Sequence, residues 1–157
     1  MQLRNFGLSG ALLAMAGATL WAQAAGVLTV SPPARLRVPR TGGVEHSLKL
    51  AVEPGYHVNS DKPNDEYLIP LRLSWDSGAV EVVAVSFPKP LLEKSDFSDK
   101  PLSLFTGNFE IVTQFKRAAG ATPGPGLLTG KLRYQACNDK MCLPPKNIVV
   151  KVPLLVE

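Results

Sequence analysis

The stretch Val44-Glu-His-Ser-Leu-Lys-Leu-Ala-Val52 decides the fold class, because nonpolar and polar residues alternate along it. Most of its apolar side chains stand at every second position, and Glu45, Ser47 and Lys49 fill positions between them. A period of two residues is typical of a β-strand that has one face in a core and the other in solvent. No stretch of the remaining chain has apolar residues at helical spacing over three turns. The sequence therefore predicts β-structure.

Five further segments have the composition of strands, and turn-forming clusters separate them. The expected strands are residues 68–75, 80–87, 109–116, 127–136 and 148–154. The clusters are rich in Gly, Pro, Asn and Asp, as in Asp61-Lys-Pro-Asn64 and in residues 119–126, which we interpret as a surface turn. Short strands interrupted in this way predict an all-β fold, an immunoglobulin-like antiparallel β-sandwich.

The N-terminus has the pattern of a secretory signal peptide. Arg4 precedes a small and apolar run over residues 6–21, and Ala22-Gln-Ala24 follows it. We therefore expect a signal peptide at residues 1–24 and one exported domain at residues 25–157, a length typical of a single core. The apolar run is too short and too rich in Gly and Ala to span a bilayer. We expect no stable membrane insertion of the mature chain.

Charge and histidine content argue against two other functions. The formal net charge is +4, and the basic residues are scattered singly, so the sequence does not predict nucleic-acid binding. His46 and His57 have no partner at a spacing typical of zinc ligands, and we expect both to be structural. We predict no metal site and no cofactor.

The two cysteines of the chain, Cys137 and Cys142, form a Cys-x4-Cys motif. The expected strand 127–136 ends just before Cys137, and Pro144 and Pro145 have no backbone N–H to donate to a sheet. We therefore expect both cysteines at the mouth of a hairpin, where opposed side chains come within disulfide distance. Export to an oxidising compartment would favour a disulfide between them.

Two interpretations of this pair remain open from the residues alone. Exported β-domains often carry one structural disulfide, yet closing a loop of about six residues stabilises a fold by only about 2 kcal/mol. A redox-active pair instead needs an accessible thiolate, which Lys140 and Lys146 favour and Asp139 opposes. The domain is therefore either a thiol–disulfide exchange protein or a noncatalytic binding or assembly module with a permanent disulfide.

The segment Tyr-Gln-Ala-Cys-x4-Cys-Leu-Pro-Pro, over residues 134–145, resembles the N-terminal periplasmic (alpha) domain of the thiol:disulfide interchange protein DsbD. Weaker similarities precede it in the same order, at residues 55–60, 68–70, 87–90 and 104–107. That family has an immunoglobulin-like fold and passes electrons to periplasmic partners such as the disulfide isomerase DsbC and the thioredoxins of cytochrome c maturation. The resemblance implies a periplasmic thiol–disulfide exchange module.

The resemblance also implies roles for four residues. Cys142 matches the cysteine that forms mixed disulfides with partners, and Cys137 matches the resolving cysteine. Phe105 matches the aromatic residue of a cap loop that covers the disulfide and moves aside for the partner, with core packing as the alternative. Tyr134 either borders the site or packs in the core with its hydroxyl satisfied. Ser103 stands where the family often has an acidic residue.

The resemblance finally implies an external electron source. The family protein continues into a membrane-embedded domain and a thioredoxin-like domain, whereas this sequence ends at Glu157. We therefore expect a separate membrane reductant or thioredoxin-like donor to supply electrons, and thioredoxin-fold proteins of the periplasm to receive them.

Overall fold

The computed structural model describes residues 26–96 and 98–157, and within these residues it contains strands and no helix. The signal peptide expected at residues 1–24 lies outside the described part. The strands are β1 (Leu28–Val30), β2 (Leu36–Val38), β3 (Gly43–Val52), β4 (His57–Asn59), β5 (Arg72–Trp75), β6 (Val80–Ser86), β7 (Leu91–Ser95), β8 (Ser98–Phe105), β9 (Asn108–Arg117), β10 (Gly124–Tyr134), β11 (Ala136–Cys137) and β12 (Lys146–Val156).

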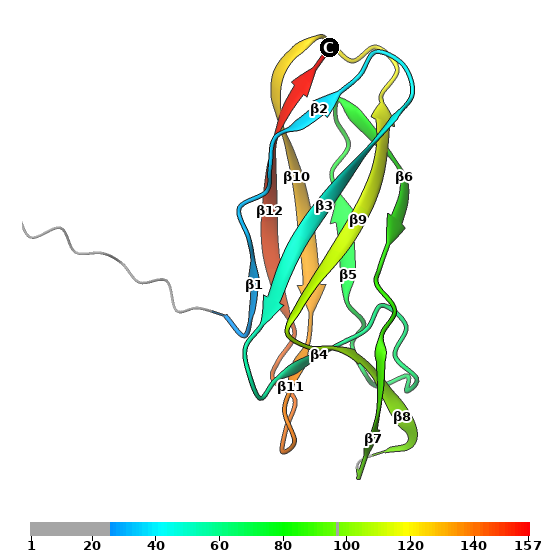
Figure 1. Ribbon diagram of the computed structural model, residues 1–157, viewed down its shortest axis with the longest axis vertical. Helices are drawn as coiled ribbons and strands as arrows, with labels where there is room; N and C mark the ends of the chain where they lie inside the picture. Colours follow the sequence, from blue (N-terminus) through cyan, green and yellow to red (C-terminus); the bar gives the residue numbers. More distant parts are fainter. Residues whose placement is uncertain (1–25, 97) are drawn as a thin grey trace, which may run out of the picture.

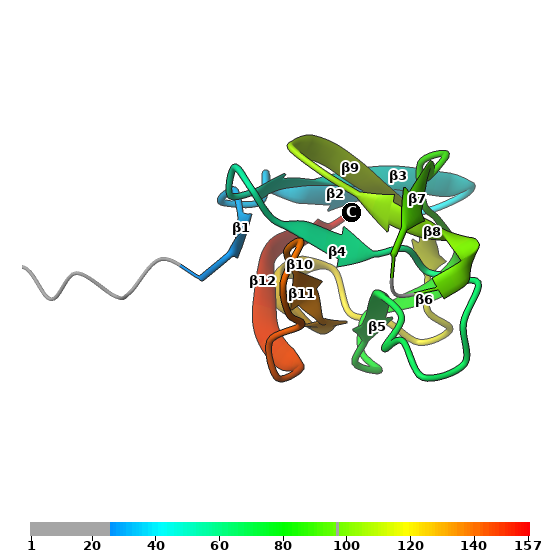
Figure 2. The same cartoon turned by 90° about the horizontal axis from the view of Figure 1, so that it is seen from below.

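Two four-stranded sheets form the body of the molecule (Figure 1), with strand orders β1-β3-β9-β6 and β2-β12-β10-β5. The view from below shows them as two layers, with β3 and β9 on one side and β10 and β12 on the other (Figure 2). Strand β2 runs parallel to β12, and the other neighbours in these two sheets are antiparallel. This arrangement confirms the predicted immunoglobulin-like β-sandwich.

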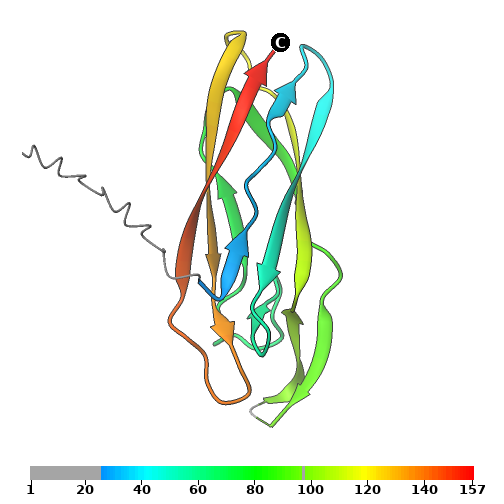
Figure 3. The same cartoon turned by 60° about the vertical axis from the view of Figure 1, so that its left-hand side comes forward.

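A third sheet, with order β11-β4-β8-β7, lies at one end of the sandwich. The C-terminus lies at the opposite end (Figure 1). The cysteine-bearing hairpin and the β7–β8 hairpin both extend from the end that carries the third sheet, as the rotated view also shows (Figure 3). The third sheet therefore places these two hairpins at the same end of the molecule.

The alternation in β3 is the one predicted from its sequence. His46, Leu48, Leu50 and Val52 are buried, and the residues between them are exposed or half-buried. Phe115 of β9 is fully buried and meets the ring of Trp75 edge to face, with 5.4 Å between ring centroids. The Trp75 indole N–H also donates a hydrogen bond to Thr113 Oγ1 at 3.1 Å. Burial of these apolar side chains between the two large sheets provides the main stabilisation of the fold.

His46 points into this core, as expected for a structural histidine. It is 6 % exposed, and its Nε2 lies within hydrogen-bond distance, 3.1 Å, of the Ala34 carbonyl oxygen. The expectation of a structural role for His46 is therefore confirmed.

Three details differ from the predicted strands. The strand expected at residues 68–75 begins only at Arg72, since Pro70 interrupts the first half of the segment. The predicted turn 119–126 is shorter than expected, because Gly124 already pairs with Val156 at the start of β10. The expected strand 127–136 divides at Gln135, where β10 ends and β11 begins in another sheet.

The predicted effect of the two prolines is confirmed. Residues 143–145 belong to no strand, and pairing resumes at Lys146, which lies opposite Tyr134. Within the described residues, nothing resembles a helix long and apolar enough to cross a bilayer.

Candidate functional site

Cys137 and Cys142 form a disulfide across the mouth of a hairpin, with 3.9 Å between their Cα atoms. The two residues are directly opposed in an antiparallel bridge. Hydrogen bonds flank them, from Asn138 N to Met141 O at 2.9 Å and from Leu143 N to Ala136 O at 2.8 Å. This pattern places the cysteines at a non-hydrogen-bonded position, where opposed side chains come closest.

The Asn138 side chain closes the turn between the cysteines. Its Oδ1 accepts hydrogen bonds from the backbone N–H groups of Lys140 and Met141, each at 2.9 Å. An asparagine that bonds to its own turn in this way fixes a short loop without help from the rest of the fold. The turn therefore keeps both cysteines in register.

Gln135 attaches the hairpin to the sandwich. Its Oε1 accepts hydrogen bonds from Asn59 Nδ2 at 3.3 Å and from the Ile69 backbone N–H at 3.2 Å. Its Nε2 donates to the carbonyl oxygen of Leu143 at 3.3 Å. One side chain thus joins strand β4, the loop after it and the segment after Cys142, a role that the sequence analysis did not anticipate.

The two sulfur-bearing residues differ in exposure. Cys137 is 3 % exposed, whereas Cys142 is exposed on the surface of the hairpin. Only an accessible sulfur can be approached by another protein's disulfide, and a buried one can react only with a sulfur already next to it. Cys142 is therefore the cysteine that solvent reaches, and Cys137 is the buried one.

Both cysteines line an open cavity of about 380 Å³ at this end of the molecule. Its floor and sides come from β4, from the loop after β4 and from the hairpin turn over residues 138–141. The facing wall belongs to the β7–β8 hairpin, through residues 93–96 and Leu102.

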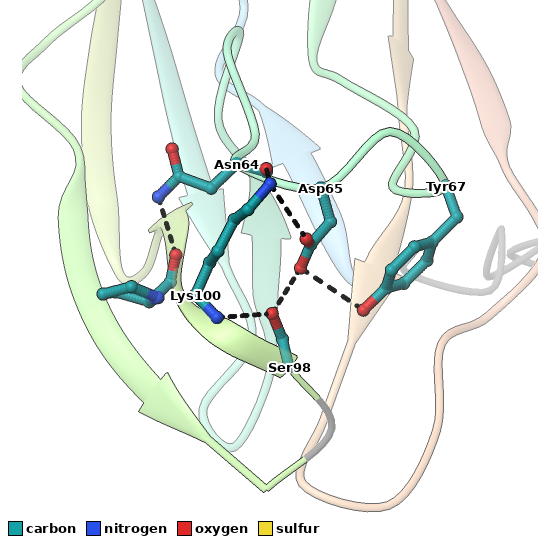
Figure 4. A network of polar contacts seen from close by, with 6 residues as sticks. Asn64, Asp65, Tyr67, Ser98 and Lys100 are labelled. Atoms are coloured by element: carbon teal, nitrogen blue, oxygen red, sulfur yellow. Dashed lines mark hydrogen bonds and ion pairs between the residues drawn. The ribbon is translucent and has the colours of Figure 1, made fainter.

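A polar network holds this wall in place (Figure 4). Asp65 accepts a hydrogen bond from Ser98 Oγ at 2.5 Å and lies 3.9 Å from the Lys100 ammonium group. The same ammonium donates to the Asn64 carbonyl oxygen at 3.2 Å, and the Tyr67 hydroxyl donates to Asp65 at 3.4 Å. Ser98 and Lys100 belong to β8, so the network connects the β7–β8 hairpin to the loop that follows β4.

The structure places the other two expected site residues in the core. Phe105 is 3 % exposed, lies opposite Val58 in β4 and stacks on Phe109 with ring centroids 4.8 Å apart. Tyr134 is 2 % exposed, and burial raises its pKa, while a hydrogen bond with the Leu28 backbone opposes that rise. Neither residue lines the cavity. The structure brings Cys137 and Cys142 together, and the wall that faces them comes from residues 93–96 and Leu102 of the β7–β8 hairpin, not from Phe105 at the end of β8.

His57 lies beside the disulfide, where the sequence analysis expected only a structural residue. It is the direct cross-strand neighbour of Cys137 in the pairing of β4 with β11, and it lines the same cavity. Burial lowers its pKa below the ordinary value, and the charges of Glu93 and Asp139 partly oppose that shift. The signal in the sequence was the position of His57 at the start of a short strand, but its partner strand could not be read from the pattern.

Within residues 26–96 and 98–157, no group of three or more His, Cys, Asp or Glu side chains is arranged to hold a metal ion.

The fold and the site define a class of protein, an immunoglobulin-like domain with a disulfide-closed hairpin at one end. The family described as "Thiol:disulfide interchange protein DsbD, N-terminal" matches residues 24–154. The chain belongs to this family, which confirms the resemblance inferred from the sequence motifs.

Two solved structures are similar to the chain at low sequence identity. The N-terminal periplasmic domain of ScsB from Proteus mirabilis is 14 % identical with a TM-score of 0.54, over 80 % of this chain and 44 % of that chain. The N-terminal domain of DsbD from Neisseria meningitidis, in the reduced form, is 17 % identical with a TM-score of 0.47, over 68 % of this chain and 74 % of that chain. The first likeness supports the fold. No curated protein matches the chain significantly in sequence.

Proposed function

We propose that the domain is a periplasmic thiol–disulfide exchange module in which Cys137 and Cys142 are the redox pair. The difference in exposure between the two cysteines carries the proposal, because exchange needs one sulfur that a partner can reach and a second sulfur next to it that resolves the mixed disulfide. Membership of the DsbD N-terminal family supports the same chemistry.

In the proposed reaction, the Cys142 thiolate attacks a disulfide of a thioredoxin-fold partner and displaces one partner thiolate. Cys137 then attacks Cys142 Sγ, which releases the second partner sulfur and forms the Cys137–Cys142 disulfide. Two electrons pass from the domain to the partner. A membrane-linked or thioredoxin-like donor reduces the domain again by the reverse exchange.

We assign the cover of the site to the β7–β8 hairpin, in place of the role expected for Phe105. The hairpin faces the cysteines across the cavity, whereas Phe105 is stacked in the core. The network around Asp65 fixes the start of β8, so opening of the hairpin would require those polar contacts to break or move. Because Cys142 itself is exposed, such a cover would shield the buried side of the disulfide, at Cys137, until a partner docks.

Exposed apolar side chains at the rim of the cavity suit a docking partner. Tyr67 is 65 % exposed and Met141 is 59 % exposed, and both line the cavity. Aromatic and methionine side chains are enriched in protein–protein interfaces. We propose that thioredoxin-fold partners contact this rim while their disulfide reaches Cys142.

The proposed location follows from the N-terminal sequence and from the family. The pattern at residues 1–24 is that of a signal peptide, so that residues 25–157 would act in the periplasm. N-terminal sequencing of the protein secreted by a bacterial host would give Ala25 as the first residue if this assignment is right.

The direct test of exchange uses the reduced domain and an oxidised thioredoxin-fold protein. Alkylation of free thiols at successive times, followed by mass spectrometry, should show two thiols appearing on the partner for each disulfide that forms on the domain. The Cys137→Ala/Cys142→Ala double variant is the control and should leave the partner oxidised. A wild-type domain that behaves like the double variant would exclude the proposed exchange.

A further inference from the structure

His57, Cys137 and Cys142 stand in one row across three adjacent segments. Cys137 is directly opposed to His57 of β4 on one side and to Cys142 on the other. Directly opposed residues of antiparallel strands project to the same face of a sheet. The imidazole therefore lies beside the buried cysteine of the pair, and all three residues line the same cavity.

The surroundings of His57 keep its imidazole free for proton exchange. Among the described residues, no hydrogen bond to the ring is found, and the side chain is half-buried. The charged groups lining the cavity with it are Glu93, Lys94 and Asp96 of the β7–β8 hairpin and Asp139 and Lys140 of the cysteine turn. Burial lowers the pKa of His57 and outweighs the opposing charges of Glu93 and Asp139, which favours the neutral ring that can accept a proton.

We propose that His57 accepts the proton of the Cys137 thiol in the resolving step, an inference that rests on the proposed function. In this step the Cys137 S–H bond breaks, and the proton moves to an imidazole nitrogen. The Cys137 sulfur forms a bond to Cys142 Sγ, and the bond from Cys142 Sγ to the partner sulfur breaks. The partner leaves as a thiolate, which takes up the proton from the imidazolium or from water.

The resolving cysteine, Cys137, needs a nearby proton acceptor more than the attacking cysteine, Cys142, does. Cys137 is 3 % exposed, and a thiol in apolar surroundings ionises less readily than one in water. Cys142 is exposed and can lose its proton to solvent. His57 is one strand away from Cys137 and two away from Cys142, so its effect should fall on resolution and not on attack.

Ellman's reagent separates the two steps without a protein partner. The reduced domain should release one thionitrobenzoate when Cys142 attacks and a second when Cys137 resolves the mixed disulfide. In the His57→Gln variant at pH 7, we expect the rate of the first release to stay within about twofold of the wild-type rate. The rate of the second release should fall by roughly 10- to 100-fold. At pH 9.5 the difference should shrink to about threefold, because Cys137 then ionises unaided.

His46→Gln is the matched control, since His46 lies in β3 outside the cavity and should leave both releases unchanged. The pH profile of the wild-type domain gives a second test that needs no variant at His57. Its second release should fall as the imidazole is protonated, with a midpoint below about pH 6.5, whereas a step limited by a free thiol would change near pH 8.5.

A second release in His57→Gln that matches wild type at pH 7 would overturn the inference. So would an equal slowing at all pH values, or a wild-type midpoint in the thiol range. Failure of the proposed function is a separate result, because it appears as a wild-type domain that reacts with Ellman's reagent but not with the disulfide of a thioredoxin-fold protein.

Discussion

Replacing Cys142 with serine is expected to abolish exchange with a thioredoxin-fold disulfide, with a loss of at least about 1,000-fold in rate. The thiolate is the nucleophile in disulfide exchange, and a serine hydroxyl is not ionised near neutral pH. Cys137 cannot substitute for it, because Cys137 is 3 % exposed behind the hairpin. The rate of partner thiol formation, followed by alkylation and mass spectrometry, measures the effect.

The fold of the Cys142→Ser variant should remain intact, which separates loss of chemistry from loss of structure. The disulfide closes only a short loop, so its removal should cost about 2 kcal/mol of the free energy of unfolding. Lys49→Gln, an exposed change in β3 outside the cavity that leaves both cysteines in place, is the control and should retain exchange. Exchange by Cys142→Ser within tenfold of wild type would contradict the assigned role of Cys142.

Replacing Cys137 with alanine is expected to trap the reaction halfway. The domain should remain bound to its partner through a stable mixed disulfide. The Cys142 thiolate can still attack the partner disulfide, but no second sulfur is left to release it. The complex should therefore accumulate to most of the limiting protein, whereas the wild-type domain should show almost none. Non-reducing electrophoresis and intact mass spectrometry detect the complex. Dithiothreitol should reduce its disulfide and separate the two proteins.

The Cys142→Ala variant is the control for this trap. It retains a thiol only at Cys137, which is buried, and should form no complex under the same conditions. A folded Cys137→Ala variant that forms no mixed disulfide would count against Cys142 as the attacking sulfur. Equal trapping by both variants would count against the assignment of distinct roles.

Local patterns in the sequence predicted six of the eight strands of the two large sheets and missed the short strands β1 and β2. The alternation in residues 44–52 corresponds to β3, whose inward side chains are buried, and the run after Pro145 corresponds to β12. These strands are long, so that period and turn signals both identify them. The cysteine hairpin was also predicted from a local pattern, because Cys137, Cys142 and the two prolines lie within ten residues of each other.

The third sheet could not be read in the same way. Strands β4 and β11 have three and two residues, too few to show a period. Their pairing joins segments that are far apart in the chain, and it alone places His57 beside Cys137. The position of Phe105 in the core depends on its pairing with Val58, and the bonds of Gln135 depend on the same packing. A local sequence pattern cannot show such contacts, because they join residues that are far apart in the chain.

The central claim is that the Cys137–Cys142 disulfide is an exchange site and not a permanent staple. The most direct measurement is its reduction potential, from the fraction of reduced domain at equilibrium with glutathione or dithiothreitol buffers of known ratio. For an exchange pair we predict a value between about −270 and −120 mV, the range of thiol–disulfide exchange proteins. A value below about −300 mV, with a disulfide that resists reduction by glutathione, would instead indicate a noncatalytic module with a structural bridge.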